Sequence, residues 1–131
     1  MIITELANRF TDLESQLARE KGDFALFALL LREDVPDRWD LVVSAPWVVE
    51  DRQAALQFFI KRIQSQLGAP ILTDLSRIVF VDPQDPSVQN LNRAIHVEHG
   101  VVEVKDSDFF GLPIKHAYII TSKRPKAIAA G

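Results

Sequence analysis

The chain has no cysteine, only five glycines and one methionine in 131 residues, and no long hydrophobic run. Without cysteine it has no disulfide, no thiolate metal ligand and no cysteine nucleophile. No stretch of about 18 consecutive apolar residues is present, so no membrane-spanning segment is predicted. No Gly-rich phosphate loop is found either. We therefore expect a cytoplasmic protein that folds around an ordinary hydrophobic core.

The charge of the chain is slightly acidic, with a formal net charge of −3. Nucleic acid is not favoured as the main partner, because phosphate binding requires a strongly positive surface. Positive charge gathers only near the C-terminus, where Lys115, Lys123, Arg124 and Lys126 occur without an acidic residue. We expect residues 123–131 to form a flexible, solvated tail, because chain ends are usually poorly ordered.

Length and composition predict one globular domain over residues 1–131, with 47% apolar and 25% charged residues. Apolar residues at helical spacing predict long helices over 2–21 and 49–67, and a short helix that begins after Asp85. Residues 70–76 are compatible with a single helical turn. Strands are predicted over 23–31, 39–45, 77–81, 101–105 and 114–121.

The stretch from Phe24 to Leu31 is apolar on both of its alternating faces and is predicted to be a central strand. The short link to residues 39–45 favours an antiparallel pair. The helix between 39–45 and 77–81 favours a parallel pair there. The link 106–113 is predicted to form an open hairpin rather than a tight two-residue turn. The fold class is α+β, a mixed sheet of about five strands in the order α-β-β-α-β-α-β-β.

Strands 23–31 and 77–81 both have apolar residues on both faces, although only two long helices are available to cover the sheet. If both helices cover one face, the short helix, the tail or a second copy of the chain must cover the other. We therefore expect a homodimer joined partly through the sheet.

Two loops are candidates for a small-ligand site. Residues 44–47 and 81–86 follow the C-terminal ends of two strands predicted to be parallel, and crevices at such ends often bind ligands. Trp47 would supply a flat face, and Asp82 and Asp85 would supply charge. The alternative is structural: Trp47 covers the core, and the aspartates cap the following helix.

A third loop carries Phe109 and Phe110 beside Gly111. Neighbouring residues of an extended chain point in opposite directions, so one of the two aromatic rings is expected to be exposed. Exposed aromatic side chains often mark protein contacts. The two residues are therefore candidate partner contacts, unless the loop folds back and buries both.

Two further constellations concern metals. His96, Glu98, His99 and His116 have the residue types that ligate zinc, but their spacing does not force them together. Asp40 with the Glu103-Val104-Lys105 triplet has the residue types of a metal-dependent nuclease. The simpler interpretation is that Glu103 and Lys105 form the solvated side of a strand.

No convergent catalytic set, cofactor motif or family resemblance is evident in the residues. The leading hypothesis is a non-enzymatic protein-interaction or accessory domain that self-associates. The second is a small-ligand-binding protein or enzyme that uses the crevice near Trp47, Asp82 and Asp85. The third is the metal-dependent nuclease. No cofactor and no bound metal are predicted.

Overall fold

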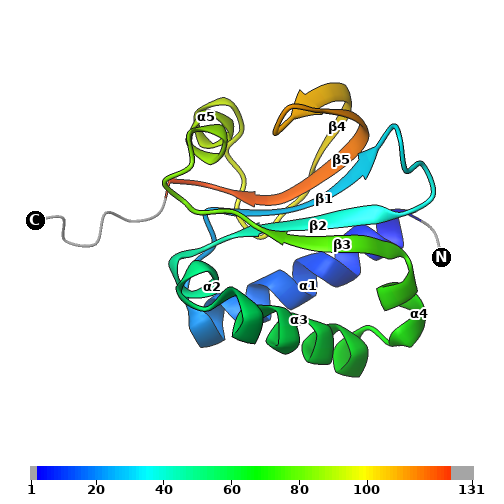
Figure 1. Cartoon of the computed structure of the whole chain (residues 1–131), viewed down its shortest axis with the longest axis vertical. Coiled ribbons are helices and arrows are strands. Elements are labelled where there is room, and N and C mark those ends of the chain that lie inside the picture. The colour runs from blue at the N-terminus through cyan, green and yellow to red at the C-terminus, as the bar shows by residue number, and fades with distance from the viewer. Residues whose placement is uncertain (1–2, 125–131) are drawn as a thin grey trace, which may run out of the picture.

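The computed structural model describes residues 3–124, with side chains from residue 5 onward, as a five-stranded sheet with helices on both sides (Figure 1). The elements in chain order are α1 (Ile3–Lys21), β1 (Leu26–Arg32), β2 (Trp39–Ser44), α2 (Pro46–Glu50), α3 (Arg52–Gln66), α4 (Ala69–Thr73), β3 (Leu75–Phe80), α5 (Pro86–Ala94), β4 (Val102–Phe109) and β5 (Leu112–Ser122). The predicted α+β class is confirmed. Residues 125–131 of the predicted tail lie outside the described residues. Over residues 3–124, no helix is long and apolar enough to cross a membrane.

The sheet has the strand order β3-β2-β1-β5-β4. β1 pairs antiparallel with β2 on one side and with β5 on the other, and β2 pairs parallel with β3. β4 completes the sheet as the antiparallel neighbour of β5. The mixed sheet, the antiparallel β1–β2 pair and the parallel β2–β3 pair are all as predicted. β1 is thus the middle strand, and residues 26–31 are buried on both faces.

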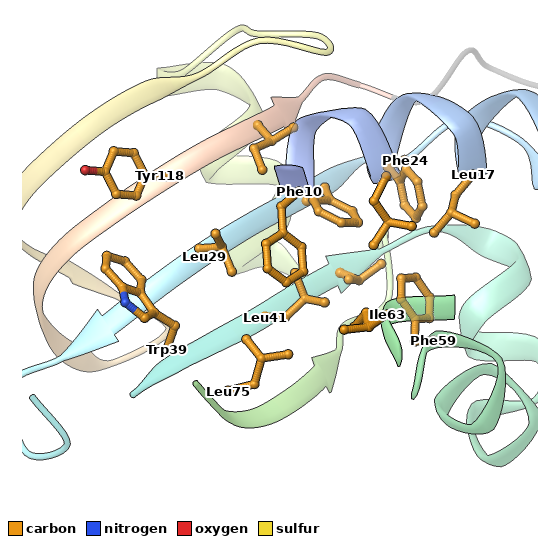
Figure 2. Close-up of a cluster of buried hydrophobic side chains, with 14 of the residues drawn as sticks. Phe10, Leu17, Phe24, Leu29, Trp39, Leu41, Phe59, Ile63, Leu75 and Tyr118 are labelled. Atoms are coloured by element: carbon orange, nitrogen blue, oxygen red, sulfur yellow. The ribbon is translucent and has the colours of Figure 1, made fainter. Parts of the chain in front are cut away.

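One face of the sheet is covered by α1 and α3, which lie side by side beneath it (Figure 1). Phe10 of α1 and Phe59 of α3 are fully buried against Phe27, Leu29 and Leu41 of the sheet. Figure 2 shows this cluster, which extends to Trp39 and Tyr118 at one end. Each fully buried large side chain contributes about 1.5–3 kcal/mol of hydrophobic free energy. We call this side the α1–α3 face.

The predicted helix over residues 49–67 is present as α3 (Arg52–Gln66), but its predicted start is wrong, because residues 46–50 form a separate short helix, α2. Pro46 begins α2 rather than only ending β2, since a proline is tolerated where the first N–H has no helical partner. Asp51 separates the two helices in an extended conformation (φ −148°, ψ 90°). Its side chain accepts a hydrogen bond from the Ala54 N–H at 3.1 Å. Asp51 is therefore the N-cap of α3, which the periodicity alone did not reveal.

The opposite face, which we call the α5 face, is covered by α5 and by the β4–β5 hairpin, which curls over the same side (Figure 1). Asn92 of α5 is buried, and its Nδ2 donates to the Ala25 carbonyl at 2.9 Å and to Ser122 Oγ at 3.0 Å. These bonds fix α5 to one end of the sheet. Ala28 and Leu30 of β1 are consequently buried within a single chain.

The third strand differs from its prediction, because β3 is not buried on both faces. Ser76 and Arg77 are exposed, and residues 78–80 are only half-buried. The reason is its place at the end of the strand order, where it has a neighbour on one side alone. Arg52 partly covers this edge by donating to the Phe80 carbonyl at 2.5 Å.

The predicted hairpin over 106–113 is present, but its loop is tight and not open. β4 continues to Phe109, and β5 begins at Leu112, directly opposite in the pairing register. The turn consists of Phe110 (φ 55°) and Gly111 (φ 75°). Positive φ at both central residues is the signature of a tight type I′ turn. The sequence did not predict this turn, because asparagine or glycine usually occupies the position that Phe110 has here.

Leu29→Ala should reduce the free energy of unfolding by about 2–5 kcal/mol, because a fully buried leucine would leave a cavity at the centre of the core. Urea denaturation measures this change. Leu56→Ala is the matched control: Leu56 is 38% exposed on α3, and its replacement should change stability by no more than about 0.5 kcal/mol. Equal losses in the two variants would contradict the assigned core.

Candidate binding site

A pocket of about 200 Å³ lies on the α5 face. Its floor consists of Leu30 of β1, Val42 of β2 and Val79 of β3; Val42 and Val79 are register partners, and Leu30 lies diagonally from Val42, since its own partner is Asp40. The tip of the β4–β5 hairpin forms one wall, with Phe109 and Phe110. The pocket lies where the cover provided by α5 ends and the curled hairpin begins, so its position follows from the uneven cover of this face.

The hairpin wall depends on an irregularity in β5. Leu31 pairs with His116 but the next residue, Arg32, pairs with Ile114, so Lys115 is an extra residue in β5. In β4, Asp106 lies nearly opposite and has a positive φ of 49°. An extra residue reverses the alternation of side chains along a strand. As a result, Ile114 points to the α5 face although His116 points to the α1–α3 face.

Phe110 has a strained backbone conformation. A φ of 55° lies in the left-handed region, which costs roughly 1–2 kcal/mol for a residue with a Cβ. Asparagine or glycine at this turn position would relieve much of that cost. Strained residues that persist often occur at functional sites. Here the strained residue places an aromatic ring in the wall of the pocket.

The polar end of the pocket is formed by Asp40 and Arg77. Asp40 is only 2% exposed, and its Oδ2 lies 2.9 Å from Arg77 Nε and 3.0 Å from Arg32 Nε. Asp40 Oδ1 is buried and has no hydrogen-bond partner among residues 3–124. An unsatisfied buried acceptor costs about 1–3 kcal/mol, so an oxygen in this position requires an explanation.

The other end of the pocket is formed by Val81 and Asp85. From Arg77 of β3 to Val81, just beyond its end, the extended chain spans roughly 13 Å, which sets the length of the apolar floor. Asp85 also caps α5, since its Oδ1 accepts from the Ser87 N–H at 2.8 Å. The predicted capping role and the predicted site role therefore fall on one residue.

The pocket brings together residues from three different sequence predictions: Asp85 of the ligand crevice, Phe109 and Phe110 of the partner loop, and Asp40 of the nuclease set. Two other predicted residues lie elsewhere. Trp47 stacks on Phe59 with ring centroids 5.8 Å apart, within the α1–α3 core. Asp82 is exposed and accepts from the Gln84 N–H at 2.8 Å.

The predicted nuclease residues do not assemble into one site. Asp40 lies on β2 and faces the pocket, whereas Glu103 lies on β4, beyond β1 and β5 in the strand order. Glu103 pairs with Tyr118, whose side chain belongs to the α1–α3 core, so Glu103 and Asp40 occupy opposite faces of the sheet. Lys105 is on the same side of β4 as Glu103 and is exposed.

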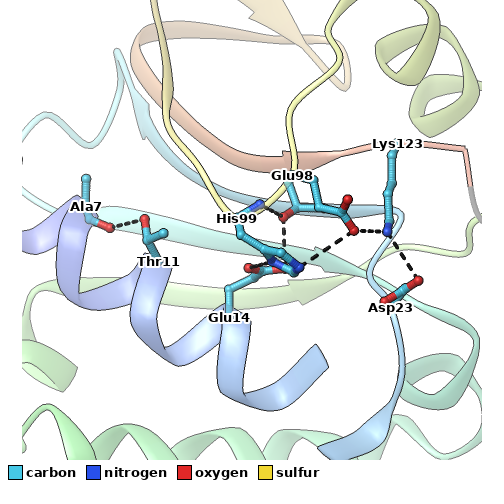
Figure 3. Close-up of polar contacts among 8 residues, drawn as sticks. Ala7, Thr11, Glu14, Asp23, Glu98, His99 and Lys123 are labelled. Atoms are coloured by element: carbon cyan, nitrogen blue, oxygen red, sulfur yellow. Dashed lines mark hydrogen bonds and ion pairs between the residues drawn. The ribbon is translucent and has the colours of Figure 1, made fainter. Parts of the chain in front are cut away.

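The predicted histidine set is also dispersed, and no group of three or more potential metal-ligating residues occurs within residues 3–124. His99 lies against buried Glu14 of α1, with Nδ1 2.6 Å from Oε1 (Figure 3). Thr121 donates to the other carboxylate oxygen of Glu14 at 2.8 Å. Glu98 pairs with Lys123 and also lies 3.6 Å from His99 Nε2, whereas His96 is exposed. The Glu14 cluster therefore joins α1 to β5.

His116 instead pairs with Glu103, with Nε2 2.8 Å from the carboxylate. Hydrogen bonds from His116, and then from Tyr118, lower the pKa of Glu103 below its usual 4.5. A lowered pKa means that the folded state favours the ionised carboxylate. This contribution is present above the unfolded pKa and is lost as the pH falls through the lowered value.

Tyr118→Phe should therefore raise the pKa of Glu103 toward 4.5, because one of the two hydrogen bonds to the carboxylate is removed. An NMR titration of the Glu103 side chain between about pH 2 and pH 7 measures the shift. Lys105→Ala should move the pKa less, since this lysine acts only as a neighbouring charge. An unchanged pKa in Tyr118→Phe would show that the tyrosine hydroxyl does not bond Glu103.

Arg32 and Arg77 are site residues that the sequence predictions missed. A signal was available: Asp40 interrupts an otherwise apolar strand, and a buried carboxylate needs cationic partners. Arg32 ends β1 and Arg77 lies within β3, so each strand adjacent to β2 supplies one guanidinium. Only the strand order and register show that both arginines reach Asp40.

Comparison with known proteins returned no match: no family model, curated protein or solved structure matches the chain.

Proposed function

We propose that this protein is a non-enzymatic binding domain that takes a small, mostly apolar molecule into the pocket on the α5 face. The observation that carries the proposal is the strained Phe110, whose turn position would be more stable with asparagine or glycine. An aromatic ring at this position weakens the turn but completes the pocket wall. Ligand binding would explain why a phenylalanine occupies this strained position.

The pocket size favours a small ligand. Its volume of about 200 Å³ exceeds the roughly 150 Å³ of an engineered cavity that binds benzene. It falls below the range of about 300–1,000 Å³ that is typical for drug-sized ligands. An apolar floor with a few polar groups at its ends is the usual composition of a ligand site. The expected ligand is therefore a compact molecule, larger than benzene and smaller than a typical drug.

The placement of the two phenylalanines also supports a ligand over a protein partner. The protein-interaction hypothesis rested on strands with two apolar faces and on the lack of a catalytic set, and it offered the Phe109–Phe110 loop as a contact element. Phe109 and Phe110 are instead half-buried and pack against the hydrophobic cluster of the α5 face. Rings that turn inward offer little area for a protein contact.

Phe110→Asn should abolish binding while changing the free energy of unfolding by no more than about 1 kcal/mol, because relief of turn strain offsets the lost packing. Binding is measured with toluene and 4-propylanisole through the amide NMR signals of Val42 and Val79. These signals should shift saturably in the wild type and in Leu56→Ala, and stay unchanged in Phe110→Asn.

The proposal fails if neither probe shifts the two valine signals, or if Phe110→Asn binds as well as the wild type. A large loss of stability in Phe110→Asn, with binding retained, would show that the ring serves the fold and not the site. Leu56 lies on α3, away from the pocket, so the control separates a local effect from a general one.

Self-association and a cytoplasmic location remain predictions from the sequence. The homodimer was expected because the second face of β1 needed cover, and α5 with the hairpin supplies that cover within one chain. The free edge of β3, with half-buried Ile78 and Phe80, is the remaining basis for it. Static light scattering tests the homodimer directly, and the mass of a monomer at working concentration would reject it.

A further inference from the structure

We infer that the ligand of the pocket is electrically neutral and carries a hydroxyl group that donates a hydrogen bond to Asp40 Oδ1. This inference rests on the proposed function and specifies the chemistry of the molecule bound. It starts from the fact that Asp40 lines the pocket, is 2% exposed, and has one oxygen without a partner among residues 3–124.

The missing partner must be a donor. An ionised carboxylate only accepts hydrogen bonds, and both arginine Nε atoms lie near the other oxygen, Oδ2. A buried acceptor of this kind is stabilised when a ligand brings an O–H or N–H group within reach. A hydrocarbon or an ether has no hydrogen-bond donor and would leave Oδ1 without a partner.

The local charges favour a neutral donor over an ammonium group. Asp40 already has two guanidinium groups within 3.0 Å, those of Arg32 and Arg77. Arg32 is also paired with Asp34 at 3.3 Å, so the two arginines and two aspartates sum to a net charge of zero. An ammonium would be placed beside two cations, and a carboxylate would be placed beside Asp40. A neutral hydroxyl adds no charge to this balanced set.

The shape of the pocket indicates the form of the ligand beyond its hydroxyl group. Asp40 lies at one end, and the aliphatic floor of Val42 and Val79 continues from it toward Asp85. The Phe110 ring forms part of the wall. A ligand with a hydroxyl at one end and an apolar body behind it would satisfy Oδ1 and bury its body on this floor. Alkyl phenols and medium-chain alcohols have this form.

Matched probes test the inference on the unmodified protein. 4-Propylphenol has the donor, 4-propylanisole has the same body with its oxygen methylated, and 4-propylbenzoate is the anionic counterpart. The amide NMR signals of Val42 and Val79 report dissociation constants at pH 7. The phenol should bind about tenfold or more tightly than the anisole, the advantage expected for a hydrogen bond to a charged group. The benzoate should bind most weakly.

Asp40→Asn and Asp34→Asn form the matched pair of variants. The side chain of asparagine at position 40 has an amide that both donates and accepts, so the preference for phenol over anisole should fall to about onefold. Asp34 pairs with the same Arg32, but it is highly exposed and is not among the pocket-lining residues. Asp34→Asn should therefore keep the preference. Circular dichroism confirms that each variant is folded.

The outcomes are distinguishable. If no probe shifts the valine signals, the proposed function fails. If phenol and anisole bind equally to the wild type, the site binds apolar molecules and the inference about Asp40 is overturned. Tightest binding of the benzoate would overturn it as well, because the arginines and not Asp40 would then select the ligand. If Asp40→Asn fails to fold, the comparison of probes on the wild type still decides the question.

Discussion

The burial of β1 on both faces is the constraint on which the rest of the structure depends. Its backbone is satisfied by β2 on one side and β5 on the other, and its side chains from Leu26 to Leu31 are withdrawn from water. A strand of this kind requires cover above and below. α1 and α3 provide one cover, and α5 with the curled hairpin provides the other.

The two covers are unequal, and the pocket follows from their difference. Two long helices fill the α1–α3 face with aromatic and branched side chains, whereas the α5 face has one helix of nine residues at one end. The remaining area is covered only by the β4–β5 hairpin, in which the alternation of side chains reverses at Lys115 and Asp106. The floor beneath it stays apolar and partly open, with Asp40 at its end. The candidate site is thus the place where the second cover is incomplete.

Much of the fold could be predicted from the sequence, but little of the site. The helix of residues 3–21 followed from its apolar stripe, the central strand from a run that is apolar on both faces, and the parallel β2–β3 pair from the strand–helix–strand order. The break between helices at Asp51 and the tight turn at Phe110 could not be predicted, because each depends on the backbone conformation of a single residue. Asp40, Asp85 and Phe110 were singled out separately. Their common pocket could not be seen, because they are brought together by strand order and by the extra residue in β5.

The sequence by itself determined the order of the strands and of the main helices α1, α3 and α5, and the burial of residues 24–31, because hydrophobic periodicity is a local property of the chain. Only the tertiary structure decided that β3 lies at an edge, that Arg32 and Arg77 meet Asp40, and that the hairpin turns over the α5 face. These features depend on contacts between residues far apart in the chain. Such contacts are fixed by which strands pair and in which register, and no single segment encodes that choice.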